Sequence, residues 1–64
     1  MSGPDELTRL KTAVDLYEQE VLENNEIYHK ASNIQNAAHL LNSYIRLLDA
    51  YRRYVSELEK YVPR

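Results

Sequence analysis

The chain has 64 residues, no cysteine and a formal net charge of −2. A chain of this length forms one domain and buries little apolar surface, so it usually needs a disulfide, a metal or a partner chain for stability. The lack of cysteine excludes disulfides and thiolate metal sites, and the small charge does not indicate a polyionic partner. Oligomerisation is the source of stability that remains.

The residues that break secondary structure all lie near the two ends. The single glycine is Gly3, and the two prolines are Pro4 and Pro63, so the interior is free to be helical. No stretch approaches the roughly 20 uncharged apolar residues of a membrane span, and the first residues lack the pattern of a secretory signal. We therefore expect an all-α protein, cytoplasmic by default.

A first helix is predicted over about residues 4–29. Pro4 suits the first helical position, Asp5 and Glu6 complement the positive end of the helix dipole, and Ser2 or Gly3 would be the cap. Apolar residues then recur three and four apart, which is the spacing of a heptad seam. The seam comprises Leu7, Leu10, Val14, Tyr17, Val21, Asn24, Tyr28 and Ala31. Asn24 is the one amide among these seam residues, and it is a candidate for fixing the register between helices. The alternative is that Asn24 simply belongs to the amide-rich middle of the chain.

A second helix is predicted over about residues 33–61. Its seam is uninterrupted over about four heptads. The seam comprises Ile34, Ala37, Leu41, Tyr44, Leu48, Tyr51, Val55, Leu58 and Val62. Neither seam can be continued through residues 24–34, because polar residues would then enter the core. The two seams therefore indicate two helices.

The break between the helices is placed at about residues 30–33. Ser32 followed by Gln35 fits a capping box, and Asn33 tolerates unusual backbone angles. This break gives two helices of similar length, as a hairpin requires. A break at Asn24-Asn25 and a single unbroken helix are the alternatives.

The apolar surface of the second helix is wider than its seam. Leu40, Leu47, Tyr54 and Tyr61 each precede a seam residue, and Ile45 widens the other side. The resulting stripe spans roughly 160°, more than one neighbouring helix covers. We expect the first helix to cover part of it and a second chain to cover the rest, giving an antiparallel four-helix bundle from two hairpins. Alternatively, the tyrosines at the margin are simply half exposed.

The favoured function is a non-enzymatic interaction module that pairs with a copy of itself. The predicted interface comprises Leu41, Tyr44, Leu48, Tyr51, Val55 and Leu58, flanked by Leu40, Leu47, Tyr54 and Tyr61. A second hypothesis is an adaptor or inhibitor that docks the same Tyr/Leu face on a larger protein. A third is nucleic-acid binding through the segment 44–54, which would use Arg46, Arg52 and Arg53. His39, Arg46, Arg53 and Lys60 are seven apart, which is also typical of a solvated face.

Catalysis and metal binding have little support in the sequence. No serine lies in a glycine-rich elbow, and neither His29 nor His39 is placed as a base beside a nucleophile. Glu26 and His29 have the Glu-x-x-His spacing of di-iron bundles, but the second helix supplies no inward carboxylate. We therefore predict no catalytic residues, no metal and no cofactor.

The origin of the chain has two interpretations. Scarce glycine and an uninterrupted heptad are common in designed helical proteins. In contrast, the predicted turn lacks the glycine that a designer normally places there. Both a natural and a designed origin remain open.

Overall fold

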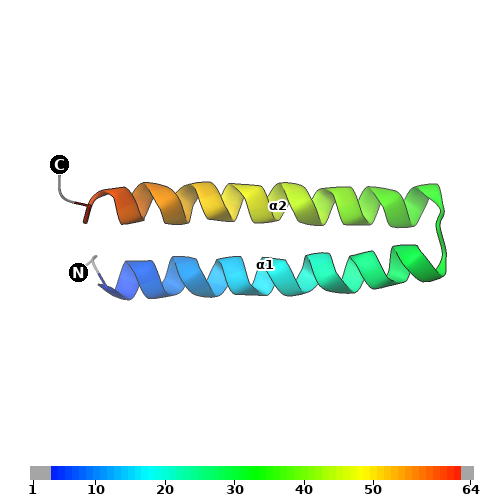
Figure 1. Cartoon of the computed structure of the whole chain (residues 1–64), viewed down its shortest axis with the longest axis horizontal. Helices are drawn as coiled ribbons and strands as arrows, with labels where there is room; N and C mark the ends of the chain where they lie inside the picture. Colours follow the sequence, from blue (N-terminus) through cyan, green and yellow to red (C-terminus); the bar gives the residue numbers. More distant parts are fainter. Residues whose placement is uncertain (1–3, 63–64) are drawn as a thin grey trace.

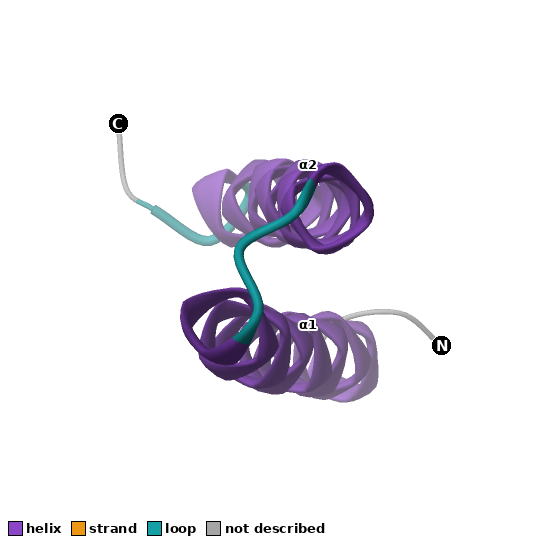
Figure 2. Ribbon diagram, turned by 90° about the vertical axis from the view of Figure 1, so that its right-hand side faces the viewer, coloured by secondary structure: helices purple, strands orange, loops and turns teal. Residues whose placement is uncertain are grey.

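Two antiparallel helices of nearly equal length make up the described part of the chain (Figures 1 and 2). The computed structural model describes residues 4–62, in which α1 spans Pro4–Lys30 and α2 spans Ile34–Glu59. The hairpin measures 46 × 19 × 15 Å and has a radius of gyration of 14.8 Å, against about 11 Å for a compact chain of this length. The predicted two-helix hairpin is confirmed, and the molecule is a rod. Neither of its helices is long and apolar enough to pass through a membrane.

The residues at the two ends of α1 suit its dipole. Asp5 and Glu6 lie in its first turn, and His29 and Lys30 lie in its last turn. The predicted cap at Ser2 or Gly3 falls outside the described residues. Asn24 and Asn25 lie within α1, so the alternative break at that pair is wrong.

The short connection between the helices consists of residues 31–33 and needs no glycine. Asn33 has an extended backbone, with φ −137° and ψ 171°, and its side chain accepts a 2.8 Å hydrogen bond from the backbone N–H of Asn36. The Asn36 side chain donates back to the Ala31 carbonyl at 2.7 Å. These two amides join the end of α1 to the start of α2.

The prediction that Ser32 caps the second helix is wrong. Its hydroxyl donates to the carbonyl of Tyr28 at 2.9 Å, and therefore satisfies the last turn of α1 instead. The cap is Asn33, one residue later, because its carboxamide oxygen reaches the N–H three residues on. Asn33 does not use the left-handed backbone region, since its φ is negative.

The predicted seam of α1 is the face that packs against α2. Val14 is 2% exposed, Val21 is also buried, and Leu10 and Tyr17 are half-buried beside them. Asn24 and Tyr28 continue the half-buried row towards the turn, whereas Ala31 lies beyond the helix and is exposed. The 3.6-residue periodicity therefore identified the inner face of this helix correctly.

The face of α2 that meets α1 is not its predicted seam. Ser43 and Ala50 are buried, and Leu40, Leu47 and Tyr54 are half-buried around them. Each of these residues directly precedes a seam residue, so the contact is turned by about 100° around the helix. Because serine and alanine are small, they allow the two helix backbones to approach closely while Val14 and Val21 fill the space between them.

Candidate protein interface

The predicted seam of α2 forms an exposed apolar face on the hairpin. Leu41 is 61% exposed and Leu48 is 60% exposed, values unusual for leucines in regular heptad spacing. The other four members of the central run are exposed to between 36% and 49%. We call this set the α2 stripe, and it comprises Leu41, Tyr44, Leu48, Tyr51, Val55 and Leu58.

The flanking residues predicted for the same interface divide into two groups. Leu40, Leu47 and Tyr54 lie on the side of the α2 stripe next to α1 and are half-buried by that helix. Tyr61 lies beyond the end of α2 and is half exposed. The structure thus brings the six stripe residues together on one face and assigns three of the flanking residues to the contact within the hairpin.

A hydrogen-bonded carboxylate lies at the border between the α2 stripe and α1. The Tyr51 hydroxyl donates to a carboxylate oxygen of Glu18 at 3.3 Å. The negative charge of Glu18 raises the pKa of Tyr51 above its ordinary value, because the phenolate form would be repelled. Asp15, three residues before Glu18, accepts a 3.0 Å hydrogen bond from Lys11, and this bond raises the pKa of Lys11.

Two of the three basic residues of the segment 44–54 make ion pairs within the hairpin, and Arg52 is exposed. Arg46 lies 3.3 Å from Glu20 of α1, and Arg53 lies 3.2 Å from Asp49 in its own helix. Exposed pairs of this kind contribute little stability, but each guanidinium has a carboxylate beside it. The surface that sequence composition assigned to nucleic acid is therefore electrically mixed.

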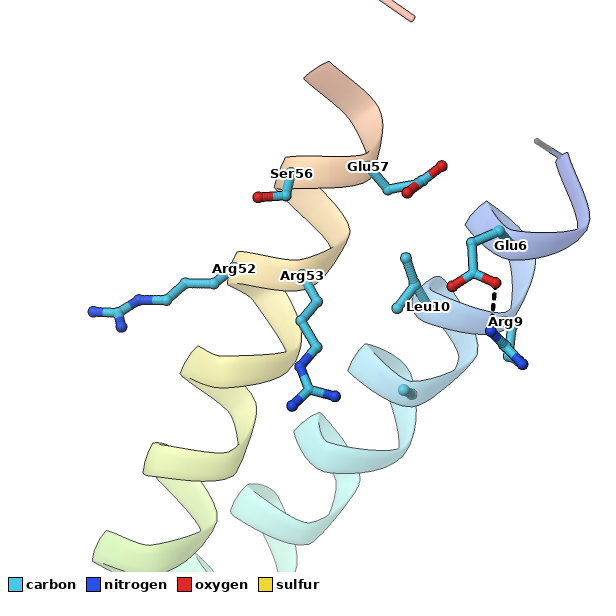
Figure 3. A pocket seen from close by; sticks show the side chains of 8 residues that line it. Glu6, Arg9, Leu10, Arg52, Arg53, Ser56 and Glu57 are labelled. Atoms are coloured by element: carbon cyan, nitrogen blue, oxygen red, sulfur yellow. Dashed lines mark hydrogen bonds and ion pairs between the residues drawn. The ribbon is translucent and has the colours of Figure 1, made fainter. Parts of the chain in front are cut away.

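A shallow cavity of about 600 Å³ lies at the open end of the hairpin (Figure 3). Side chains from the beginning of α1 and the end of α2 line it, and they carry both signs of charge. Glu6 pairs with Arg9, and Glu57 accepts a 3.1 Å bond from Lys60. Because these carboxylates already have partners and Arg52 points away from α1 in Figure 3, the cavity offers no concentrated charge for a ligand.

Residues 4–62 contain no group of three histidines or carboxylates arranged to hold a metal ion. Glu26 and His29, the single Glu-x-x-His pair, are both exposed on α1. Asn24 is half-buried in the face that meets α2. It lies in the contact between the helices, where a register-setting amide would have to be.

Two residues of the helix contact were absent from the sequence prediction. Ser43 is 1% exposed and Ala50 is buried, yet neither is large enough to contribute to an apolar seam. The signal lay in their spacing, since residues 40, 43, 47, 50 and 54 also follow the alternation of three and four. Glu18 was likewise unpredicted, because nothing along α1 indicates that it meets Tyr51.

The comparisons with known proteins add no relative: no family model, curated protein or solved structure matches the chain. The strongest functional feature among the described residues is the α2 stripe. It is apolar, periodic and exposed, and α1 leaves it uncovered. A function for this chain must explain that face.

Proposed function

We propose that the protein is a non-enzymatic self-association module, in which two hairpins pair through the α2 stripe to form an antiparallel four-helix bundle. The observation that carries this proposal is the exposure of six apolar residues in heptad spacing on a folded hairpin. Exposure of such residues to water is unfavourable, and the free energy falls when a helix with matching side chains covers them.

The exposed area of the hairpin supports a partner of its own size. The accessible surface is 5251 Å², whereas a compact monomer of this mass exposes about 4,300 Å². The excess of roughly 950 Å² is comparable to the area that each partner contributes to a standard interface, about 800 Å². A second hairpin would cover an area of that size.

The direction of the α2 stripe also fits a four-helix bundle. Each helix of such a bundle has two neighbours at roughly right angles around its axis. In α2, the residues that contact α1 and the stripe residues are one position apart in sequence, which is about 100° around the helix. One neighbour is α1, and the α2 stripe faces the place of the second.

The charges of α2 are arranged so that the α2 stripe can be buried. Arg46, Asp49 and Arg53 lie more than about 100° away from the stripe around the helix, and their ion pairs leave them on the opposite side. The polar atoms within the stripe are the tyrosine hydroxyls, which reach the margin of an interface and need no charge to compensate them. Arg52 and Glu59 each lie four residues after a stripe residue, at the margin of the stripe, and both are exposed, so pairing can leave their charged ends in water.

Sedimentation equilibrium of the chain at several concentrations tests this function. We expect a mass of two chains that falls to one chain in Leu48→Asp, because the substitution places a carboxylate in the middle of the α2 stripe. The matched control is Leu16→Asp on α1, since Leu16 is 62% exposed and lies outside the stripe. This control should remain dimeric.

A helical wild-type chain that sediments as a monomer at every concentration would overturn the proposal. The α2 stripe would then be a docking face for a different protein, as an adaptor or inhibitor presents. Equal loss of mass in both variants would also contradict it, because the effect would not depend on the stripe.

A further inference from the structure

Resting on the proposed self-association, we infer that the two α2 helices meet antiparallel about a two-fold axis level with Asp49 and Ala50. Leu41 then faces the partner's Leu58, Tyr44 faces the partner's Val55 and Leu48 faces the partner's Tyr51. Isologous pairing of this kind repeats each contact twice, so all six residues of the α2 stripe are covered. Both the direction and the register of the interface are then fixed.

The spacing of the α2 stripe supports the register. Its members are separated by three, four, three, four and three residues, so the series reads the same in both directions. When a second copy is reversed, each member can be placed level with another member, and every pair of residue numbers adds to the same value. A shift by one heptad towards the connection would instead set Val55 and Leu58 against the partner's Ala37 and Ile34, although Ala37 is half-buried in the hairpin and Ile34 is the first residue of α2. A shift the other way would carry Leu41 and Tyr44 past the end of the partner's α2.

Side-chain volume favours the antiparallel direction. Parallel helices in register would place Tyr44 against the partner's Tyr44 and Tyr51 against the partner's Tyr51, while the leucines met one another. The reversed arrangement instead sets each aromatic ring against an aliphatic side chain, so the layers have similar volumes and large residues alternate with small ones. The helix dipoles also oppose one another in this direction, and they would repel if parallel.

The contact between Tyr51 and Glu18 holds one of these rings in place. The hydroxyl of Tyr51 is tied to α1 of its own hairpin at 3.3 Å, at the border of the stripe. The polar end of the ring therefore has a partner within the monomer, and the rest of the ring is free to cover the partner's Leu48. Glu18 acts here as a positioning residue.

Disulfide formation between single-cysteine variants tests the register, since the chain has no cysteine of its own. An equimolar mixture of Leu41→Cys and Leu58→Cys should form a mixed disulfide, because these positions face one another. Neither variant alone should form a disulfide-linked dimer, since its two thiols lie about 25 Å apart along the axis. Mass spectrometry distinguishes the mixed product from the two homodimers.

The matched control mixes Leu41→Cys with Ser56→Cys, which lies at a similar level but on a different side of α2 and should not crosslink. Sedimentation of each variant separates the two hypotheses. Dimers without the mixed disulfide would overturn the register and leave self-association standing, and a disulfide in Leu41→Cys alone would show parallel helices. A monomeric mass for the wild-type chain would remove the proposed function itself.

Discussion

The hydroxyl of Tyr51 on α2 donates a hydrogen bond to the carboxylate of Glu18 on α1, at 3.3 Å and across 33 residues of sequence. It joins the exposed apolar face of one helix to the acidic flank of the other. Arg46 and Glu20 form another polar contact between the helices, at 3.3 Å. Together they bind α2 to α1 where the buried valines lie between the helices.

The first prediction concerns the ionisation of Tyr51. Glu18 raises the pKa of this phenol, so its contribution to stability is fully present below about pH 10, the unfolded value, and is lost as the pH rises through the higher folded value. Glu18→Gln should lower the pKa of Tyr51, as followed by NMR of the tyrosine ring carbons. Glu26→Gln removes the same charge away from Tyr51. An equal effect of the two changes would mean that the contact is not the cause.

The second prediction concerns the buried row of α1. Val14→Ala should lower the free energy of unfolding by about 2 kcal/mol, because it removes two methyl groups and leaves a cavity between the helices. Leu22→Ala is the control, since Leu22 is exposed and its truncation should change stability by less than about 0.5 kcal/mol. Urea denaturation followed by circular dichroism measures both. A larger loss of unfolding free energy in Leu22→Ala would mean that the face of α1 that contains Val14 is not the one that packs in the core.

The third prediction concerns the size of residue 43. The Ser43 hydroxyl donates to the Leu40 carbonyl at 2.7 Å within its own helix, so the polar group has no role between the helices. Ser43→Ala should therefore be nearly neutral, whereas Ser43→Leu should destabilise by about 1–3 kcal/mol through overpacking. Asn42→Leu adds a similar bulk at an exposed position and serves as the control in thermal unfolding. Tolerance of Ser43→Leu would show that the helices are not in close contact there.

The fourth prediction concerns the start of α2. Asn33→Ala should cost about 1 kcal/mol, because the N–H of Asn36 loses its acceptor. Ser32→Ala should cost less, since its hydroxyl only supplements a carbonyl in the last turn of α1. Chemical denaturation of the two variants decides between the capping box expected from sequence and the observed cap. A greater loss in Ser32→Ala would favour the capping box.

The two helices and the inner face of α1 were predictable because each depends on local periodicity. Leu10, Val14, Tyr17 and Val21 lie on one narrow face, so one interpretation of their pattern is available. The position of the connection was also predictable, because the two seams cannot be joined. The cap was misplaced by one residue, since serine and asparagine are both strong caps and their order is decided by tertiary geometry.

The side of α2 that meets α1 was not predictable from hydrophobicity, although the spacing of its residues permitted it. Apolar residues cover a wide arc of this helix, and hydrophobicity alone does not rank one part of the arc above another. The selection is made by Ser43 and Ala50, which contribute little apolar area but allow close approach. The contact of Tyr51 with Glu18 was hidden for the same reason, because it follows from the rotation of α2.

The antiparallel hairpin has a consequence for the order of folding events. Residues beside the three-residue connection meet partners only a few positions away, whereas Arg46 and Glu20 are 26 positions apart and Tyr51 and Glu18 are 33 apart. Each contact closes a loop of chain between its two residues, and this loop becomes steadily longer from the connection towards the open end. The entropic cost of closing it rises accordingly. We expect the contacts between the helices to form first beside Asn33 and then progressively towards the open end, on the fast timescale of local helical contacts. The contacts of Glu6 and Leu10 with the end of α2 should form last.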